Sequence, residues 1–112
     1  IDGNLTFTDG LRVDGEIFGD LRANPETSSI LVISESATVQ GEIHADHVVI
    51  NGTVRGPVHS RDLLELQPKA RIDGDVYYKA LGMRQGAVIA GQLHPVEVAD
   101  EKPLLKLAAN NS

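Results

Sequence analysis

The sequence predicts an all-β fold, a parallel β-helix of about five to six turns with three short strands in each turn. Three observations lead to this prediction. One glycine-containing phrase recurs along the chain, its copies lie about 17 residues apart, and the 112 residues include 11 Gly but only 4% aromatic residues. Repeats of fixed period fold as stacked units. A narrow β-helix interior holds stacked aliphatic side chains but has little room for rings.

The recurring phrase alternates apolar and polar residues around its glycine. A period of two is typical of half-buried strands, and no stretch of the first 94 residues has the 3.6-residue period of a helix. The copies are LRVDGEI from Leu11, ATVQGEI from Ala37, VINGTVRGPV at 49–58, ARIDGDV from Ala70 and AVIAGQL from Ala87.

A second short apolar alternation precedes most copies of the phrase. From Leu31 onward its starts are separated by 17, 16 and 17 residues, whereas the first interval, from Leu5 to Leu31, is 26 residues. We assign the roughly nine extra residues to RANPETSS at 22–29, which is polar and contains a proline. This segment is predicted to form a surface loop.

A β-sandwich would use the Asp-Gly and Asn-Gly pairs as hairpin turns. From Gly15 onward, however, the glycines lie inside the alternating runs, whereas a hairpin glycine separates two runs. We therefore expect one β-helix turn per repeat, with a bend where glycine permits tight geometry. The predicted turns are 5–21, 31–47, 48–63, 64–80 and 81–95.

In this arrangement equivalent residues of the copies form columns along the rod. The predicted glycine column is Gly15, Gly41, Gly56, Gly74 and Gly91. The predicted inward aliphatic columns are Val13, Val39, Val54, Ile72 and Ile89, and Ile17, Ile43, Val58, Val76 and Leu93.

Composition excludes several classes of function. The net charge of −6, from 10 Lys+Arg and 16 Asp+Glu, argues against nucleic acid as a main partner. Without cysteine there is no disulfide and no thiol nucleophile. The longest apolar run, 30–33, is far shorter than a membrane span, and we recognise no signal peptide.

Two regions differ in composition. Residues 1–94 carry the repeats and are predicted to be one domain, whereas 95–112 lack the repeat phrase. In the tail, Leu104, Leu105, Leu107 and Ala108 suit a short amphipathic turn. So short a segment does not hold a helix alone, and we expect 95–112 to be a disordered tail.

The repeats resemble those of the bactofilins, the polymer-forming cytoskeletal proteins of bacteria. The resemblance implies a right-handed β-helix that polymerises end to end without nucleotide. It also implies a cytoplasmic scaffold at the inner face of the membrane that recruits cell-wall or cell-shape partners, such as cell-wall enzymes or other scaffolded proteins. Members often reach the membrane through an N-terminal tail, which we expect this chain, starting at Ile1, to lack. The matching segments are GLRVDGEIFGDL (10–21), LVISESATVQGEI (31–43), VVINGTVRGPV (48–58), LELQPKARIDGDVYY (64–78) and LGMRQGAVIAGQL (81–93).

The ends of the rod are the predicted contact surfaces. A β-helix end exposes unpaired backbone and an apolar cross-section unless a cap covers it. Neither IDGN at 1–4 nor HPVEVADEKP at 94–103 looks like a cap, so we expect end-to-end stacking. The alternative is that chain beyond either end folds over it. The predicted polymerisation interface is Leu5, Phe7, Leu11, Val13, Leu81, Met83, Val88, Ile89 and Leu93.

Three histidines share one predicted outward column. His44, His59 and His94 lie about one repeat apart, with Phe18 and Tyr77 filling the same column in the other turns. We favour a ladder of stacked planar rings and predict neither a metal nor a cofactor. The alternative is a transition metal held by His44 and His59, with His47 as a third ligand.

Enzymatic functions are disfavoured. Glu16, Glu42 and Asp75 are predicted to form one outward acidic column, and paired carboxylates can hydrolyse glycosides. The single modest insertion does not build a cleft, so we interpret this column as a solvated face. No phosphate-binding loop or nucleophile-elbow motif is present in the sequence.

Two other functions stay open. A hexapeptide acyltransferase also stacks three-sided coils, but its repeats step by six residues, whereas the steps from Gly41 to Gly56, Gly74 and Gly91 are 15, 18 and 17. We therefore predict a structural protein and no enzyme. A non-polymerising β-helix adaptor that binds one protein partner is the second alternative.

Overall fold

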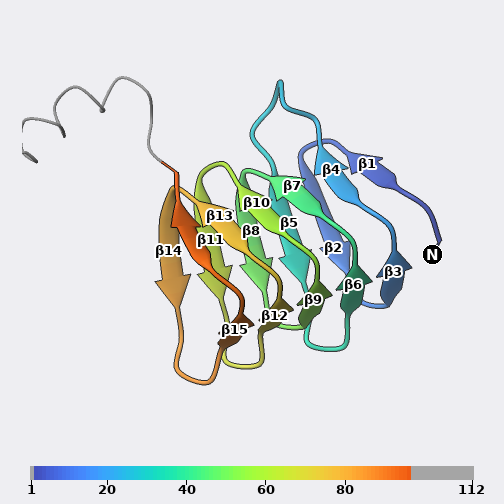
Figure 1. Cartoon of the computed structure of the whole chain (residues 1–112). Coiled ribbons are helices and arrows are strands. Elements are labelled where there is room, and N and C mark those ends of the chain that lie inside the picture. Colours follow the sequence, from blue (N-terminus) through green and yellow to red (C-terminus); the bar gives the residue numbers. More distant parts are fainter. Residues whose placement is uncertain (1, 97–112) are drawn as a thin grey trace, which may run out of the picture.

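The computed structural model describes residues 2–96, and all its paired strands run parallel (Figure 1). The strands form three sheets, which we name after their first strands. The β1 sheet contains β1 (Leu5–Phe7), β4 (Leu21–Ala23), β7 (Ile43–Ala45), β10 (Val58–Ser60), β13 (Val76–Tyr78) and β16 (Leu93–Pro95). The β2 sheet contains β2 (Gly10–Val13), β5 (Ile30–Ile33), β8 (His47–Ile50), β11 (Leu63–Leu66) and β14 (Ala80–Met83). The β3 sheet contains β3 (Glu16–Phe18), β6 (Thr38–Gln40), β9 (Thr53–Arg55), β12 (Arg71–Asp73) and β15 (Val88–Ala90).

Neighbours within each sheet are three strands apart along the chain, so the backbone winds as a solenoid. Each turn gives one strand to each sheet, and β2–β4, β5–β7, β8–β10, β11–β13 and β14–β16 are successive turns that follow β1. Residues 2–96 contain no helix. The predicted all-β fold with stacked three-strand turns is therefore confirmed.

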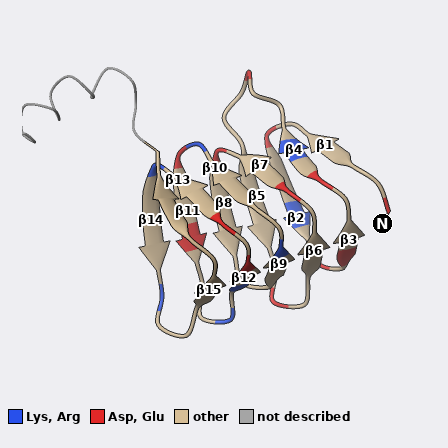
Figure 2. Ribbon diagram, viewed as in Figure 1, with Lys and Arg blue, Asp and Glu red and all other residues tan. Residues whose placement is uncertain are grey.

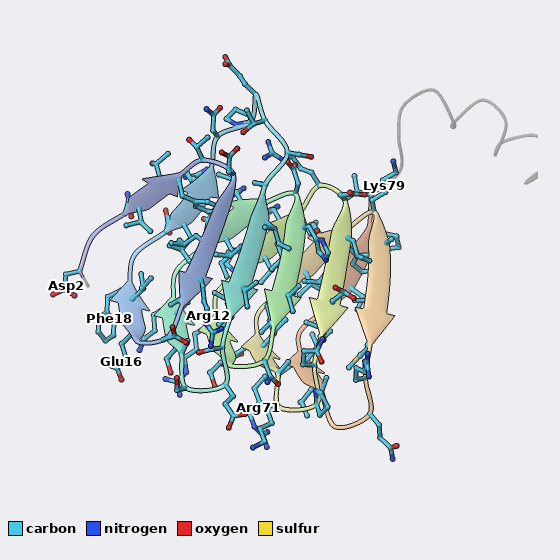
Figure 3. All side chains as sticks on the ribbon, turned by 180° about the vertical axis from the view of Figure 1, so that it is seen from behind. Asp2, Arg12, Glu16, Phe18, Arg71 and Lys79 are labelled. Carbon is cyan, nitrogen blue, oxygen red and sulfur yellow. The ribbon has the colours of Figure 1, made fainter. Side chains whose placement is uncertain are left out.

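The core consists of aliphatic side chains stacked along the axis of the rod. Alternation along each strand decides which side chains enter it: in β5, Leu31 and Ile33 are fully buried, whereas Ile30 is 42% exposed. Charged residues lie on the outer faces and the corners (Figure 2), and Ser29 and Ser60 are the buried polar residues of the described chain. Outer columns also carry polar side chains such as Glu16 and Arg71, which point away from the ribbon (Figure 3).

The register of the first turn differs from the prediction. Ile17, and not Val13, pairs with Val39, while Val13 pairs with Ile33 in the β2 sheet. The sequence GEIFGDL contains two glycines four residues apart, and both alignments place the aliphatic residues on the same face. Alternation alone does not distinguish them, because a shift by an even number of residues keeps every side chain on its side.

Two further predictions for this turn are wrong for the same reason. Leu5 pairs with Leu21 in the β1 sheet and is not the equivalent of Leu31, which pairs with Leu11. The inserted loop therefore consists of the six residues 24–29 between β4 and β5. The equivalent corner one turn further along, between β7 and β8, is the single residue Asp46. The insertion thus adds five residues and not nine, and it runs over the surface as predicted.

Gly19, and not Gly15, is the member of the glycine column in the first turn, and Gly19 lies over the carbonyl of Gly3. The corner of each turn passes directly over the carbonyl of the glycine below, and a Cβ on Gly41 would collide with the carbonyl oxygen of Gly19. Gly19 and Gly41 also have φ of +152°, a conformation that side chains disfavour. The predicted places of Gly56, Gly74 and Gly91 in the glycine column are confirmed, because a Cβ added at any of them would meet the glycine of the previous turn.

Candidate functional site

The C-terminal end of the rod is an apolar surface that the described residues leave uncovered. β14, β15 and β16 are the outermost strands of their sheets, each paired on one side within residues 2–96. Met83 continues the column of the fully buried Leu66, yet it is 48% exposed. Leu93 likewise follows the buried Val76 and is 46% exposed. Both occupy inward columns at the last turn, where a further turn would cover them.

The other residues predicted for this end divide into two groups. Leu81 and Ile89 continue inward columns and are half-buried at the end of the rod. Val88 pairs with Arg71 in an outward column of the β3 sheet, so its exposed side chain lies on the flank. Val88 is therefore placed differently from its four predicted companions.

The N-terminal end is more closed. Phe7 and Val13 are buried, whereas Leu5 and Leu11 are half-buried. An open cavity with a volume of about 380 Å³ lies at this end. It is lined by Leu5, Leu11, Arg12, Val13, Asp14, Gly15, Glu16 and Ile17. The two ends thus offer exposed apolar side chains on one side and a concave apolar surface on the other.

Four aromatic rings stack along the outer face of the β1 sheet. His44, His59, Tyr77 and His94 come from β7, β10, β13 and β16, and their ring centroids are 4.3, 4.5 and 4.5 Å apart with interplanar angles of 4°, 0° and 12°. The spacing follows from the separation of neighbouring parallel strands. The predicted ring ladder is confirmed for these four residues.

The first turn contributes a different residue to this column. Phe18 pairs with Gln40 in the β3 sheet, and Arg22 pairs with His44. The prediction of Phe18 in the ladder is therefore wrong, because it used the incorrect register of the first turn. Sequence analysis missed Arg22, since no local signal marks which residue of that turn lies beside His44.

Carboxylates flank both ends of the ring stack. His44 Nε2 lies 2.9 Å from Glu42 Oε1, and His94 Nε2 lies 3.3 Å from Asp75 Oδ2. The Arg22 guanidinium is 3.8 Å from Glu42 Oε1. The hydrogen bond from the backbone N–H of Gln92 is the largest cause that lowers the pKa of Asp75, and the side-chain hydrogen bond with His94 is the second.

The central imidazole is biased toward its neutral form. Burial, followed by the charge of His44, lowers the pKa of His59, while Glu42 opposes that shift and Arg22 adds to it. A neutral imidazole keeps a lone pair for a hydrogen bond or a metal.

His47 lies elsewhere. It belongs to β8 in the β2 sheet, and its Nε2 lies 2.9 Å from Glu65 Oε1. The structure therefore does not bring His47 to the His44 and His59 pair, so the metal alternative lacks the third ligand that it named.

The predicted acidic column is only partly correct. Glu42 and Asp75 occupy equivalent corners of their turns, but Glu16 belongs to the column of Thr38 in the β3 sheet. Asp20 Oδ1 accepts a hydrogen bond from the Glu42 N–H, and Asp75 Oδ1 accepts one from the Gln92 N–H. The carboxylates of Asp20 and Asp75 thus bind the backbone of the next turn, which gives both a structural role.

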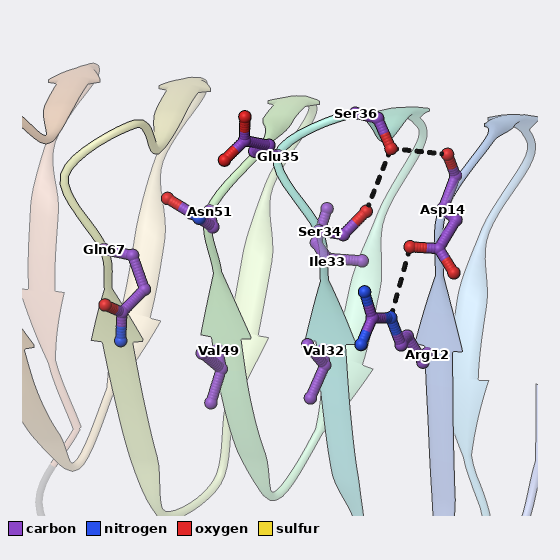
Figure 4. A pocket seen from close by; sticks show the side chains of 10 residues that line it. All are labelled: Arg12, Asp14, Val32, Ile33, Ser34, Glu35, Ser36, Val49, Asn51 and Gln67. Carbon is purple, nitrogen blue, oxygen red and sulfur yellow. Dashed lines mark hydrogen bonds and ion pairs between the residues drawn. The ribbon is translucent and has the colours of Figure 1, made fainter.

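A groove of about 360 Å³ crosses the outer face of the β2 sheet (Figure 4). Its polar rim is internally bonded: Arg12 Nε lies 3.1 Å from Asp14 Oδ1, and the Ser36 hydroxyl donates to the Asp14 carbonyl at 3.0 Å. Hydrogen bonds from Ser34 and Arg12 lower the pKa of Asp14. The lining residues are Arg12, Asp14, Val32, Ile33, Ser34, Glu35, Ser36, Val49, Asn51 and Gln67. We assign no ligand to this groove.

The described segments include no helix long and apolar enough to cross a lipid bilayer. The fold and its ends define the class of the protein, a parallel β-solenoid whose apolar core reaches the surface at its C-terminal end. The chain belongs to the bactofilin family of polymer-forming cytoskeletal proteins, whose family model matches residues 1–94. It is similar to Bactofilin BacO of Myxococcus xanthus (strain DK1622), with 26% identity over 98 residues that cover 80% of this chain and 78% of the relative. No solved structure gives a significant match.

Membership in this family identifies a structural, polymer-forming cytoskeletal protein and confirms the resemblance seen in the repeats. The family is not one of enzymes.

Proposed function

We propose that this bactofilin polymerises by stacking its solenoid end to end, without nucleotide. The observation that carries the proposal is the apolar surface of the last turn, where Met83 and Leu93 occupy inward columns but remain nearly half exposed. Covering them with another copy would remove apolar area from water, which is favourable, and would give the outermost strands hydrogen-bond partners.

The proposed contact comprises the apolar side chains at the two ends. At the C-terminal end these are Leu81, Met83, Ile89 and Leu93, and at the N-terminal end they are Leu5, Phe7, Leu11 and Val13. Val88 lies on the flank and is therefore omitted from the proposed contact.

The wider role that we propose is a scaffold in the cytoplasm, peripheral to the inner membrane, that recruits cell-wall or cell-shape proteins and catalyses no reaction. Family membership supports this role. The regular outward columns of a polymer would repeat any partner site at each subunit, which favours recruitment through multivalency.

Two variants of the last turn test the end contact. Met83 and Val88 are 48% and 44% exposed, but Met83 belongs to an inward column and Val88 to an outward column on the flank. Glutamate at Met83 would place a charge inside the proposed contact, whereas glutamate at Val88 would lie beside Arg71 on the flank. We expect the parent and Val88→Glu to form filaments in electron micrographs and to pellet on ultracentrifugation, and Met83→Glu to stay in the supernatant.

Circular dichroism and thermal melting would verify that both variants keep the fold. Pelleting of Met83→Glu to the same extent as the parent would exclude the C-terminal end as the contact. A parent protein that stays a uniform monomer would contradict polymerisation and favour the adaptor function.

A further inference from the structure

We propose that Glu42, His44 and His59 form a binding site for a divalent transition-metal ion such as Zn²⁺. Each residue offers one ligand atom, and these three atoms lie within 4.8 Å of one another. Two imidazoles and one carboxylate are a donor set that suits zinc and leaves a fourth position for water. This inference does not depend on polymerisation, because the three residues lie on the flank of the rod.

The backbone holds the three ligands in place. His44 and His59 are directly paired residues of the adjacent strands β7 and β10, and Glu42 comes immediately before β7. Bonds of about 2.0–2.1 Å in a tetrahedral site separate ligand atoms by about 3.3 Å. Glu42 Oε1 is already 2.9 Å from His44 Nε2. The lone pairs of the stacked imidazoles lie in parallel ring planes, so the two rings would have to rotate toward each other and open the stack to share one ion. Both side chains are only partly buried, which permits this rotation.

A proline in the next turn leaves Glu42 available as a ligand. At the equivalent corners, Asp20 and Asp75 accept hydrogen bonds from the backbone N–H of the residue one turn further along. The residue one turn beyond Glu42 is Pro57, which has no N–H to donate. The Glu42 carboxylate instead turns to His44.

The site also has a suitable charge state. A metal at His44 Nε2 would take the place of the proton that this nitrogen and Glu42 Oε1 share in their hydrogen bond. A neutral imidazole at His59 would coordinate the metal through a ring-nitrogen lone pair. The nearby Arg22 guanidinium would move off the carboxylate, which its half-exposed position allows.

No equivalent site occurs elsewhere among residues 2–96. Tyr77 separates His59 from His94 in the ring stack, so the His94 and Asp75 pair has no second imidazole beside it. His47 pairs with Glu65 in a similar way, but its strand neighbour on the other side is Ile30. His47 is therefore a matched control, a histidine with a carboxylate partner at 2.9 Å but no second ring.

Isothermal titration calorimetry with Zn²⁺ alone tests the proposal. The protein should carry no polyhistidine tag and should first be treated with a chelator to remove bound metal. We expect one ion per chain for the parent protein. His59→Phe keeps a planar ring in the stack but removes a ligand, and it should weaken binding at least tenfold. His47→Phe should bind as the parent does. Excess Zn²⁺ should also raise the melting temperature of the parent but not that of His59→Phe, because a ligand that binds only the folded state stabilises it.

Three results would overturn the site: no heat of binding with the parent, equal affinity of His59→Phe and the parent, or equal affinity of Glu42→Gln and the parent. Repeating the titration on Met83→Glu separates the two proposals. Zinc binding by that variant should match the parent whether or not the protein polymerises, and its loss there would contradict a site on the flank.

Discussion

At the residue scale, the corner glycines impose the strictest local requirement. The chain turns from the β3 sheet into the β1 sheet so close to the turn below that the carbonyl of one glycine occupies the space of a Cβ on the next. At Gly41 this close approach coincides with φ of +152°. A side chain at Gly41 would therefore meet both a backbone collision and an unfavourable conformation.

Gly41→Ala should consequently destabilise the fold by about 2 kcal/mol or more. Gly15→Ala is the matched control, because a Cβ on Gly15 meets nothing within 4 Å. Urea unfolding followed by circular dichroism would measure both. Equal stability of the two variants would contradict the close approach at the corner.

The imidazole of His59 gives stability a dependence on pH. Burial lowers the pKa of His59 in the folded state below its unfolded value of about 6.5. Protons then bind the unfolded chain more readily than the folded chain. The contribution of the neutral His59 to the free energy of unfolding is therefore complete above about pH 6.5 and is lost as the pH falls below that value. Between about pH 7.5 and 5.5, we expect the urea midpoint to fall less for His59→Phe than for the parent. A fall of equal size would show that His59 does not contribute.

At the scale of elements, the loop at 24–29 is fastened to the corner below it. The Ser29 N–H donates to Asp46 Oδ2 at 3.0 Å, and the Asp46 N–H donates to Ser29 Oγ at 3.0 Å. Arg61 Nε lies 2.7 Å from Asp46 Oδ1. Asp46 thus joins three successive turns, which allows a longer loop without loss of the register between β5 and β8.

Replacing Asp46 by alanine should cost about 1–3 kcal/mol, because the mostly buried Ser29 would lose its acceptor. Asp62→Ala is the control, since Asp62 is an exposed carboxylate near the same corner. Thermal unfolding would compare the two. If Asp62→Ala proves as destabilising as Asp46→Ala, general surface charge and not this hydrogen-bonded corner is responsible.

At the scale of the whole molecule, a rod with a net charge of −6 has an apolar surface at its end. Like charges repel copies that approach each other, and salt screens this repulsion without weakening apolar contacts. The proposed polymerisation should therefore increase with salt.

The amount of pelleted protein should rise when NaCl is raised from about 0.01 to about 0.15 M, as the screening length falls from about 30 to about 8 Å. The protein concentration needed for filaments should fall over the same range. Ultracentrifugation at fixed protein concentration would measure the change. A decrease with salt would indicate that ion pairs, and not apolar side chains, form the contact.

The sequence by itself determined that this chain is a stack of three-strand turns and which side chains fill its core. These properties follow from local patterns: period two assigns each side chain to a face, and the repeat of about 17 residues stacks equivalent positions. The ring ladder from His44 to His94 was predictable for the same reason, since its members recur with the repeat.

Only the tertiary structure decided the register of the first turn and the contacts that depend on it. Gly15 and Gly19 fit the alternation equally well, and hydrogen bonds between turns select Gly19. That choice removes Phe18 from the ladder and brings Arg22 to it. The meeting of Glu42 with the two imidazoles likewise depends on how neighbouring turns align, which a period of two does not specify.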